Sequence, residues 1–308
     1  MKYSVCVIIP CYKDSKTLDR AIKSVYSQSR KVDEIIVVND CSPETEEIKK
    51  IISLYPELVY HRNDKNIGLA ATRNVGIKKS KSDIITFLDA DDEIHFKKIE
   101  LQLLFFQSNS AISCYSTRKS SGFNHNFNKS FRIVKHNNIK RLLLRNTILG
   151  AGIMISRKLL LNVEGYDENL RSCEDWDLWL RLISNGVNIV SLKLPLYLYY
   201  DNPNSLSNNY YNISFYETKL LEKHIINLKH SSVFIQFLWI TTILKQINRF
   251  GKKLNDKFLS QKNKQENSKL KKLILNNIYN KVDFIIFRYA LKLILKINLF
   301  KIFNYKNN

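Results

Sequence analysis

The sequence predicts an α/β fold, in which helices flank a mostly parallel sheet and a basic helical extension follows. Three observations support this class. Short apolar runs alternate with amphipathic segments between residues 5 and 88, an order typical of parallel sheets with crossover helices. Hydrophobic residues make up 44% of the 308 residues, which is ordinary for a protein with a core. After residue 210 the composition shifts to Lys, Asn, Ile, Leu and Phe.

The first strand and the first helix are predicted near the N-terminus. Residues 5–9 form a continuous apolar run that ends at Pro10, as expected for a strand buried on both faces. Residues 15–28 carry apolar side chains at helical spacing. Ser15 is a suitable N-cap for this helix, because its hydroxyl could accept a bond from a free backbone N–H.

Three further strands follow in the first half, and a helical segment precedes each of the last two. The strands are mainly apolar runs, two of which begin with an acidic residue, and turn-forming residues separate them from the helices. The predicted strands cover residues 34–38, 58–60 and 83–88, and the predicted helices cover residues 43–54 and 69–79.

The second half is less regular. Apolar periodicity alternates there with polar stretches rich in Gly, Ser and Asn, which favour loops. The predicted elements are a helix over 99–107, a strand over 112–117, a loop over 119–129, a helix over 175–184 and strands near 187–190 and 194–200.

Residues 210–308 are predicted to form basic amphipathic helices. From residue 201 onward the chain has 19 Lys and Arg against 6 Asp and Glu, within a net charge of +21. This excess favours an anionic partner. Arg288, Lys292 and Lys296 share one face of the apolar segment 285–303. Two interpretations stay open: a helix lying in an anionic membrane surface, or a core-packed helix with solvated lysines.

The cysteines indicate a reducing, cytosolic location. Their number, five, is odd, and their spacing fits no metal site. No signal peptide is expected, because the first apolar run is a short strand. No spanning helix is expected either, since no window reaches 18 uncharged apolar residues.

Acidic residues follow two of the predicted strands. Asp40 follows one strand, and Asp89, Asp91 and Asp92 follow another. Ligands bind beyond the carboxyl ends of parallel strands, so these residues should converge with Pro10 on one crevice. Crowded carboxylates repel one another unless a cation lies among them, and Mg²⁺ prefers carboxylate oxygens together with phosphates. The alternative is that the three aspartates cap the following helix.

An ordered set of motifs resembles the inverting family 2 glycosyltransferases of the GT-A fold, bacterial surface-glycan type. The resemblance covers roughly residues 3–207; each motif alone is weak, but their order and spacing are specific. The motifs are Val7 to Tyr12, Ile35 to Ser42, Asn66 to Asn74, Phe87 to Asp92, Gly165 to Glu168 and Glu174 to Arg181.

The resemblance implies a Rossmann-like catalytic domain over residues 1–209. Its nucleotide-binding half would cover residues 1–95 and its acceptor half residues 96–209. Residues 210–308 would then be a basic amphipathic helical extension that follows this domain.

The resemblance also implies how the donor nucleotide is held. Pro10 and Tyr12 lie where the family contacts the nucleotide, Tyr12 by stacking on the base. Asp40 corresponds to an acidic residue that hydrogen-bonds the base, and Arg73 would lie near the base or the diphosphate. Tyr12 could instead be an ordinary aromatic residue at a strand end.

The two acidic clusters correspond to different parts of the family's chemistry. Asp89, Asp91 and Asp92 match an Asp-x-Asp-type motif that holds ribose and Mn²⁺ or Mg²⁺, with Asp91 and Asp92 as the expected metal ligands. Asp175 matches the catalytic base. A divalent cation stabilises a departing diphosphate, and a carboxylate can take the proton of the attacking hydroxyl. The structural alternative is that Glu174 and Asp175 only stabilise a helix N-terminus through the helix dipole.

The implied function is a metal-dependent transfer of sugar, from a nucleotide-sugar that is expected to be a UDP-sugar. The expected acceptor is a hydroxyl of a lipid-linked or surface glycan, such as lipopolysaccharide, O-antigen or capsule. The expected location is the inner face of the cytoplasmic membrane, on an anionic surface, with no nucleic-acid partner.

Some positions depart from the family pattern or have a structural explanation. Asn39 and Cys41 stand where Asp and Gly are common, and the segment 199–207 lacks the frequent Arg and His. Asp177 and Arg181 are spaced for a surface ion pair. Trp176 and Trp179 suit packing better than an acceptor platform.

Two rival functions remain. A sugar-phosphate nucleotidyltransferase would need a glycine-rich phosphate loop, and residues 7–14 contain no glycine. A nucleic-acid-binding protein would account for the charge of +21, but the basic region has no recognisable reading motif.

Overall fold

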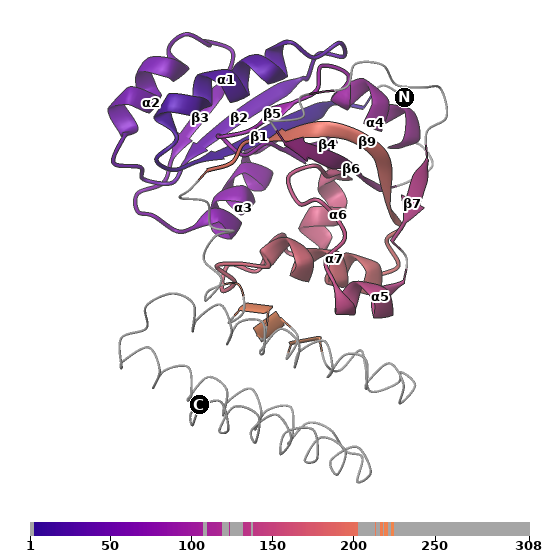
Figure 1. The fold of residues 1–308 in the computed structure, drawn as a ribbon. Helices are drawn as coiled ribbons and strands as arrows, with labels where there is room; N and C mark the ends of the chain where they lie inside the picture. The colour runs from indigo at the N-terminus through magenta and orange to yellow at the C-terminus, as the bar shows by residue number, and fades with distance from the viewer. Residues whose placement is uncertain are drawn as a thin grey trace, which may run out of the picture. The chain divides into compact units, whose positions relative to one another are not determined.

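The fold was obtained as a computed structural model (Figure 1). The structure describes residues 3–106, 110–118, 123, 132–136 and 138–202, and seven isolated positions at 213, 216, 217, 219, 220, 223 and 224. The chain separates into two units, residues 1–216 and 217–308, and the description below concerns the first. The domain boundary at residue 209 stays a prediction.

Four parallel strands form the N-terminal half of the sheet. β1 (Val5–Cys11) lies between β2 (Glu34–Asn39) and β4 (Ile84–Phe87), and β3 (Val59–Arg62) pairs with the far side of β2. Every residue of β1 and of β4 is buried. The continuous apolar runs therefore predicted these strands correctly, because strands covered on both faces show no alternation.

Three helices connect these strands: α1 (Ser15–Tyr26), α2 (Thr45–Ile52) and α3 (Leu69–Lys79). The prediction of Ser15 as N-cap is wrong. Asp14 occupies the N-cap, because its carbonyl accepts the first helical bonds, from Thr17 and Leu18 at 3.1 and 3.0 Å.

The second half of the sheet mixes strand directions. The full order is β3-β2-β1-β4-β8-β6-β9-β5, and β7 pairs with β9 off this path. β6 and β9 are parallel, whereas β8 is antiparallel to both β4 and β6. The added strands are β5 (Glu93–Ile94), β6 (Ala111–Arg118), β7 (Ile133–Lys135), β8 (Met154–Ser156) and β9 (Ile189–Tyr199).

The two strands predicted near 187–190 and 194–200 are one strand, β9. The exposed Lys193 interrupts the apolar run and suggested a break. The backbone continues through it, because β9 carries extra residues opposite Cys114 to Ser116 of β6 and the pairing resumes at Pro195.

Four helices complete this unit. α4 (Lys98–Phe106) and α7 (Glu174–Ser184) were predicted, each within one residue at either end. α5 (Ile139–Leu144) and α6 (Arg157–Asn162) were not, because six residues are too few to show a helical period.

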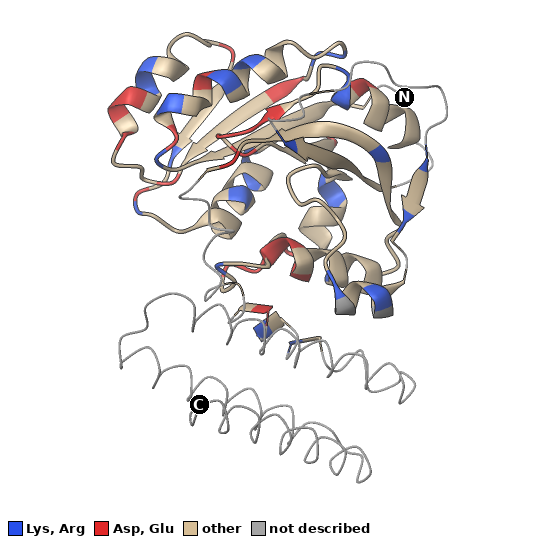
Figure 2. Cartoon of the chain, in the orientation of Figure 1, with Lys and Arg blue, Asp and Glu red and all other residues tan. Residues whose placement is uncertain are grey.

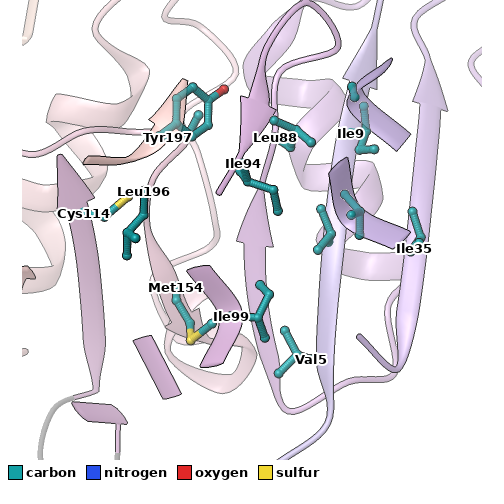
Figure 3. Packing of buried hydrophobic residues seen from close by; sticks show 14 of the residues in the cluster. Val5, Ile9, Ile35, Leu88, Ile94, Ile99, Cys114, Met154, Leu196 and Tyr197 are labelled. Carbon is teal, nitrogen blue, oxygen red and sulfur yellow. The ribbon is translucent and has the colours of Figure 1, made fainter. Parts of the chain in front are cut away.

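Both halves of the sheet share a hydrophobic core (Figure 3). Val5, Ile9, Leu88, Met154 and Tyr197 are each at most 1% exposed. Burial of one such aliphatic side chain contributes about 1.5–3 kcal/mol. This core holds the carboxyl ends of β1, β2 and β4 at one edge of the sheet.

A chain of buried hydrogen bonds links α4 and β4 to the segment before β8. The fully buried Lys98 donates through Nζ to Thr86 Oγ1 at 2.8 Å, and Thr86 Oγ1 donates to the Ile153 carbonyl at 2.7 Å. Gln102 Nε2 donates to the Gly152 carbonyl at 2.9 Å. These bonds fix the segment that leads into β8.

Several predictions lie outside the described residues. They are the loop over 119–129 apart from Phe123, residues 203–207 of the segment 199–207, and the helical extension over 210–308 apart from the isolated positions. Among the described residues, no helix has the length and apolar character to cross a membrane.

Candidate active site

Arg73 joins the two acidic clusters of the sequence. It lies on α3 and is 4% exposed. Its NH2 nitrogen is 3.0 Å from Asp89 Oδ1, and its NH1 nitrogen is 2.9 Å from Glu174 Oε1. The sequence did not predict these ion pairs, because the two carboxylates lie far apart along the chain. The structure therefore connects both clusters, whose acidic residues Figure 2 draws in red, through one buried side chain.

The carboxylates of Asp89 and Glu174 compensate the cost of burying the Arg73 charge. Burial alone lowers the pKa of Arg73, but Asp89, Tyr166 and Glu174 outweigh it and raise the pKa above its ordinary value. The guanidinium also lies 5.5 Å from the centre of the Tyr166 ring. Removing one partner of a buried ion pair leaves an uncompensated charge and destabilises by about 3–5 kcal/mol.

The loop after β4 carries Asp89, Asp91 and Asp92, as predicted. Asp89 and Asp91 are partly exposed, whereas Asp92 is 1% exposed. The chain after β9 bonds to this loop: the Tyr200 N–H donates to Asp92 Oδ1 at 2.8 Å, and Asn202 Nδ2 donates to Asp91 Oδ2 at 3.0 Å. The end of β9 thus holds the acidic loop.

Arg20 on α1 supports the same loop and was not predicted. Its NH2 nitrogen donates to the Asp91 carbonyl at 2.5 Å, and its Nε nitrogen is 3.2 Å from Glu93 Oε1. Its guanidinium stacks 3.6 Å from the centre of the Tyr200 ring. A planar guanidinium suits this combination of stacking and bonding better than a lysine would.

The carboxylates of this loop perturb one another. Burial, and then the charge of Asp89, raises the pKa of Asp92 to about 8. Burial also raises the pKa of Asp14 to about 6, with contributions from Asp91 and Asp89. The crevice thus concentrates negative charge, which favours a bound cation.

The donor set fits a divalent cation that shares its coordination with phosphates. Mg²⁺ in such sites is held by one or two carboxylates plus substrate oxygens. Asp91 offers a partly exposed carboxylate, while Asp92 lies deeper. In the part of the chain that the structure describes, no three His, Cys, Asp or Glu side chains form a ready-made metal cage.

Asp175 lies on the first turn of α7. Its Oδ2 accepts from Asn146 Nδ2 at 3.1 Å, and its Oδ1 accepts from the Trp176 N–H at 2.6 Å. Asn146 was missed, because only the fold places it beside Asp175. Burial, and then the charge of Glu174, raises the pKa of Asp175 to about 6. A carboxylate near this value is a suitable general base.

Gly150 leaves room for the Asp175 carboxylate. A Cβ atom at this position would lie 2.8 Å from Asp175 Oδ2. No sequence pattern pointed to this glycine. Its role becomes visible only when the segment before β8 lies against α7.

Asp40 is 3% exposed and holds the turn before α3. Its Oδ1 accepts from the Ile67 N–H at 2.9 Å, and its Oδ2 accepts from the Gly68 N–H at 2.8 Å. A contact of Asp40 with a nucleotide base stays a prediction. Gly68 is favoured here, because its φ is +89°, a backbone conformation that residues with a Cβ atom rarely adopt.

The remaining nucleotide-side residues lie at the end of β1. Pro10 is buried within β1 and pairs with Val38. Tyr12 follows the strand and is 40% exposed, so its ring is available for stacking. The roles of both residues toward a nucleotide stay predictions.

The C-terminal part of α7 is structural. Arg181 Nε is 2.7 Å from Asp177 Oδ2, which confirms the predicted ion pair, but Asp177 is fully buried. The expectation of a surface pair is wrong, because α7 packs this face inward. Trp176 and Trp179 are also buried, as expected for packing residues.

The sequence matches the family model described as glycosyl transferase family 2 over residues 6–167. It is 33% identical over 181 residues to an uncharacterized glycosyltransferase of Haemophilus influenzae, a match that covers 58% of this chain and 61% of that protein. It is 27% identical over 212 residues to TuaG of Bacillus subtilis, a putative teichuronic acid biosynthesis glycosyltransferase, covering 67% and 82%.

Two solved structures share the fold. Staphylococcus aureus TarS (residues 1–349) has a TM-score of 0.64 at 18% identity, covering 91% of this chain and 81% of that one. TarS has also been solved with UDP-GlcNAc, with a TM-score of 0.55. The mannosyltransferase PcManGT of Pyrobaculum calidifontis, solved with GDP-Man and Mn²⁺, has a TM-score of 0.61 at 12% identity, covering 92% and 89%.

These neighbours confirm the predicted fold class. The chain spans 27% to 65% of the length of five curated glycosyltransferases that it matches.

Proposed function

The chain belongs to glycosyl transferase family 2, and from this premise we propose that it transfers a sugar, with inversion, from a UDP-sugar to a hydroxyl of a surface or lipid-linked glycan. The similarity to TuaG, a putative teichuronic acid biosynthesis glycosyltransferase, and the fold shared with TarS, which was solved with UDP-GlcNAc, support this substrate class. The observation that carries the proposal is the double ion pair of Arg73, which brings a predicted donor cluster and a predicted base to one crevice.

On the donor side, Tyr12 and Asp40 would contact the nucleotide base and Asp89 the ribose. Asp91 and Asp92 would hold Mn²⁺ or Mg²⁺, which when bound neutralises charge on the departing diphosphate. Arg73 on α3 holds Asp89 in place through its ion pair. Because the guanidinium is buried, water does not compete for its bond to Asp89, and the guanidinium can hold the acidic loop in one orientation.

On the acceptor side, Asp175 would accept the proton of the attacking hydroxyl through a carboxylate oxygen. Asn146 and the Trp176 N–H orient that carboxylate. A raised pKa strengthens a carboxylate as a base at neutral pH. One base on the far side of the sugar gives a single displacement and inverts the anomeric centre.

The proposed location is the inner face of the cytoplasmic membrane, where nucleotide-sugars and lipid-linked acceptors meet. The basic composition after residue 201 supports contact with an anionic surface. Co-sedimentation of the full chain with anionic and with neutral vesicles tests this location.

The activity is tested by nucleotide release and product analysis with a panel of UDP-sugars and GDP-mannose, with Mn²⁺ or with EDTA. We expect Asp175→Asn to lower transfer by about 10²–10⁴-fold, as for loss of a general base. Glu46→Gln, a charge-matched change at an exposed site, should leave transfer unchanged. Full activity of Asp175→Asn would refute the base assignment, and equal turnover in EDTA would refute the metal role.

A further inference from the structure

A long part of the acceptor half contains no acidic residue. Residues 101–163 include ten Lys and Arg but neither Asp nor Glu. Most acidic residues of this half stand in and shortly before α7, as Glu174 and Asp175 do. The exceptions are Glu100 on α4 and Asp201 after β9, which pairs with Arg118. Residues 119–163 therefore form a basic stretch whose charges are separated along the chain from the acidic start of α7.

Five exposed basic side chains form what we call the basic strip. They lie just before and on β7, on and just after α5, and on β9, along one side of the unit in Figure 2. No carboxylate of the described residues lies within ion-pair distance of any of them. The strip consists of Arg132, Lys135, Arg141, Arg145 and Lys193.

The members of the strip repel one another. Arg141 and Arg145 are four residues apart at the end of α5, a spacing at which like charges destabilise a helix. The backbone N–H of Lys193 donates to the Arg132 carbonyl at 2.9 Å, which places two more cations on adjacent strands. Burial, and then the nearby Arg141, lowers the pKa of His136. The strip thus maintains a positive potential that nothing in the described part of the chain neutralises.

The strip is connected directly to the proposed base. Arg145 precedes Asn146, which donates to Asp175 at 3.1 Å. Trp176, next to Asp175, donates through Nε1 to the Leu142 carbonyl of α5 at 2.8 Å. A polymer bound along the strip would therefore end beside Asp175.

From this placement we propose that the acceptor is a phosphate-bearing glycan, which the basic strip binds so that a hydroxyl reaches Asp175. Arg side chains match phosphate oxygens with paired donors, and several along a line suit a repeating phosphodiester. The carboxylates of Glu174 and Asp175 repel the phosphates at the crevice itself, so that a neutral hydroxyl enters. This inference rests on the proposed glycosyltransferase activity and names its acceptor class.

Binding is measured first, on the full chain, with inorganic polyphosphate as the anionic probe and dextran as the neutral one. We expect Arg141→Gln/Arg145→Gln to weaken polyphosphate binding about tenfold, the equivalent of one lost charge-assisted bond. Lys78→Gln/Lys79→Gln removes the same charge from exposed positions on α3 and should change it less than twofold. Binding of the wild type should also weaken as salt is added.

Equal weakening by both double variants would overturn the inference, because only net charge would then matter. The inference would also be overturned if Arg141→Gln/Arg145→Gln lost binding to phosphatidylglycerol vesicles or duplex RNA but bound polyphosphate as the wild type does. The strip would then bind a membrane or a nucleic acid. Thermal unfolding of each variant controls for folding.

Kinetics separate this inference from the proposed function. With a phosphodiester-linked polyol acceptor, Arg141→Gln/Arg145→Gln should raise the acceptor KM about tenfold at unchanged kcat, while its donor hydrolysis without acceptor stays at the wild-type rate. Absence of any nucleotide-sugar turnover by the wild type would refute the proposed function. Turnover with a neutral glycan acceptor at an equal or lower KM would refute the inference alone.

Discussion

At the scale of single residues, Asp175 predicts the pH dependence of transfer. Its pKa is raised to about 6 by burial and by Glu174, and a base must be deprotonated to act. Activity should therefore rise as pH increases through about 6 and be lost below it. The measurement is kcat/KM between pH 5 and 8. In Glu174→Gln, which removes a like charge, this rise should move to lower pH.

The matched control for that shift is Glu168→Gln, since Glu168 is exposed on the turn before α7. Glu168→Gln should leave the rise of kcat/KM at the same pH as in the wild type. An unchanged pH dependence in Glu174→Gln would contradict the contribution of Glu174 and leave burial as the cause of the raised pKa of Asp175.

Motif spacing predicted which carboxylates gather in the crevice, but not what holds them. Asp89, Asp91 and Asp175 follow from strand and helix ends, which sequence periodicity reveals. Asn146 and Gly150 belong to a segment without a regular pattern, and their contacts with Asp175 depend on long-range packing.

At the scale of elements, Asn74 fastens α3 to the turn before α7. Its Nδ2 donates to the Tyr166 carbonyl at 2.8 Å, and its Oδ1 accepts from the Tyr166 N–H at 2.8 Å. Asn74→Ala would leave both buried backbone groups unpaired, at about 1–3 kcal/mol each. We expect the free energy of unfolding to fall by about 2–4 kcal/mol, measured by urea denaturation.

Asn169→Ala is the comparison for this variant. Asn169 is exposed on the same turn and bonds only locally, to Asp167. It should change the free energy of unfolding by less than about 0.5 kcal/mol. Similar losses in both variants would mean that Asn74 does not fasten the two elements.

The elements that the sequence revealed are the longer ones, which have either a clear period or clear ends. α3 was predicted at its exact bounds, because its ends coincide with Gly68 and Ser80. The two-residue β5 and three-residue β7 carry no period of their own and form only because β9 offers an edge. Their existence is a tertiary effect that local sequence does not encode.

At the scale of the whole molecule, the buried Lys98 limits stability at neutral pH. Burial lowers its pKa from 10.5 to about 8, so the folded state releases its proton before the unfolded state does. Stability from this group therefore rises with pH between about 8 and 10.5 and is absent below. The shift corresponds to about 3 kcal/mol.

Lys98→Met should accordingly raise the free energy of unfolding at pH 7 by about 1–3 kcal/mol. Thr86 keeps its own donated bond to Ile153, so the variant leaves no donor unpaired. Urea denaturation at pH 7 and pH 10 measures the difference, which should shrink at the higher pH. A variant less stable than the wild type at pH 7 would show that the Lys98 bond to Thr86 outweighs its desolvation.

β9 extends from the basic strip to the acidic loop after β4, so its length determines the distance between these two regions. Its early residues pair with β7, and its later residues pair with β5 beside the acidic loop. The Tyr197 hydroxyl accepts from the Asp89 N–H at 3.1 Å. One inserted residue would turn every later side chain to the opposite face, and two would restore the facing but displace the loop by about 7 Å. Length can therefore vary in the surrounding loops, whereas the span of this strand sets how far apart the basic strip and the acidic loop lie.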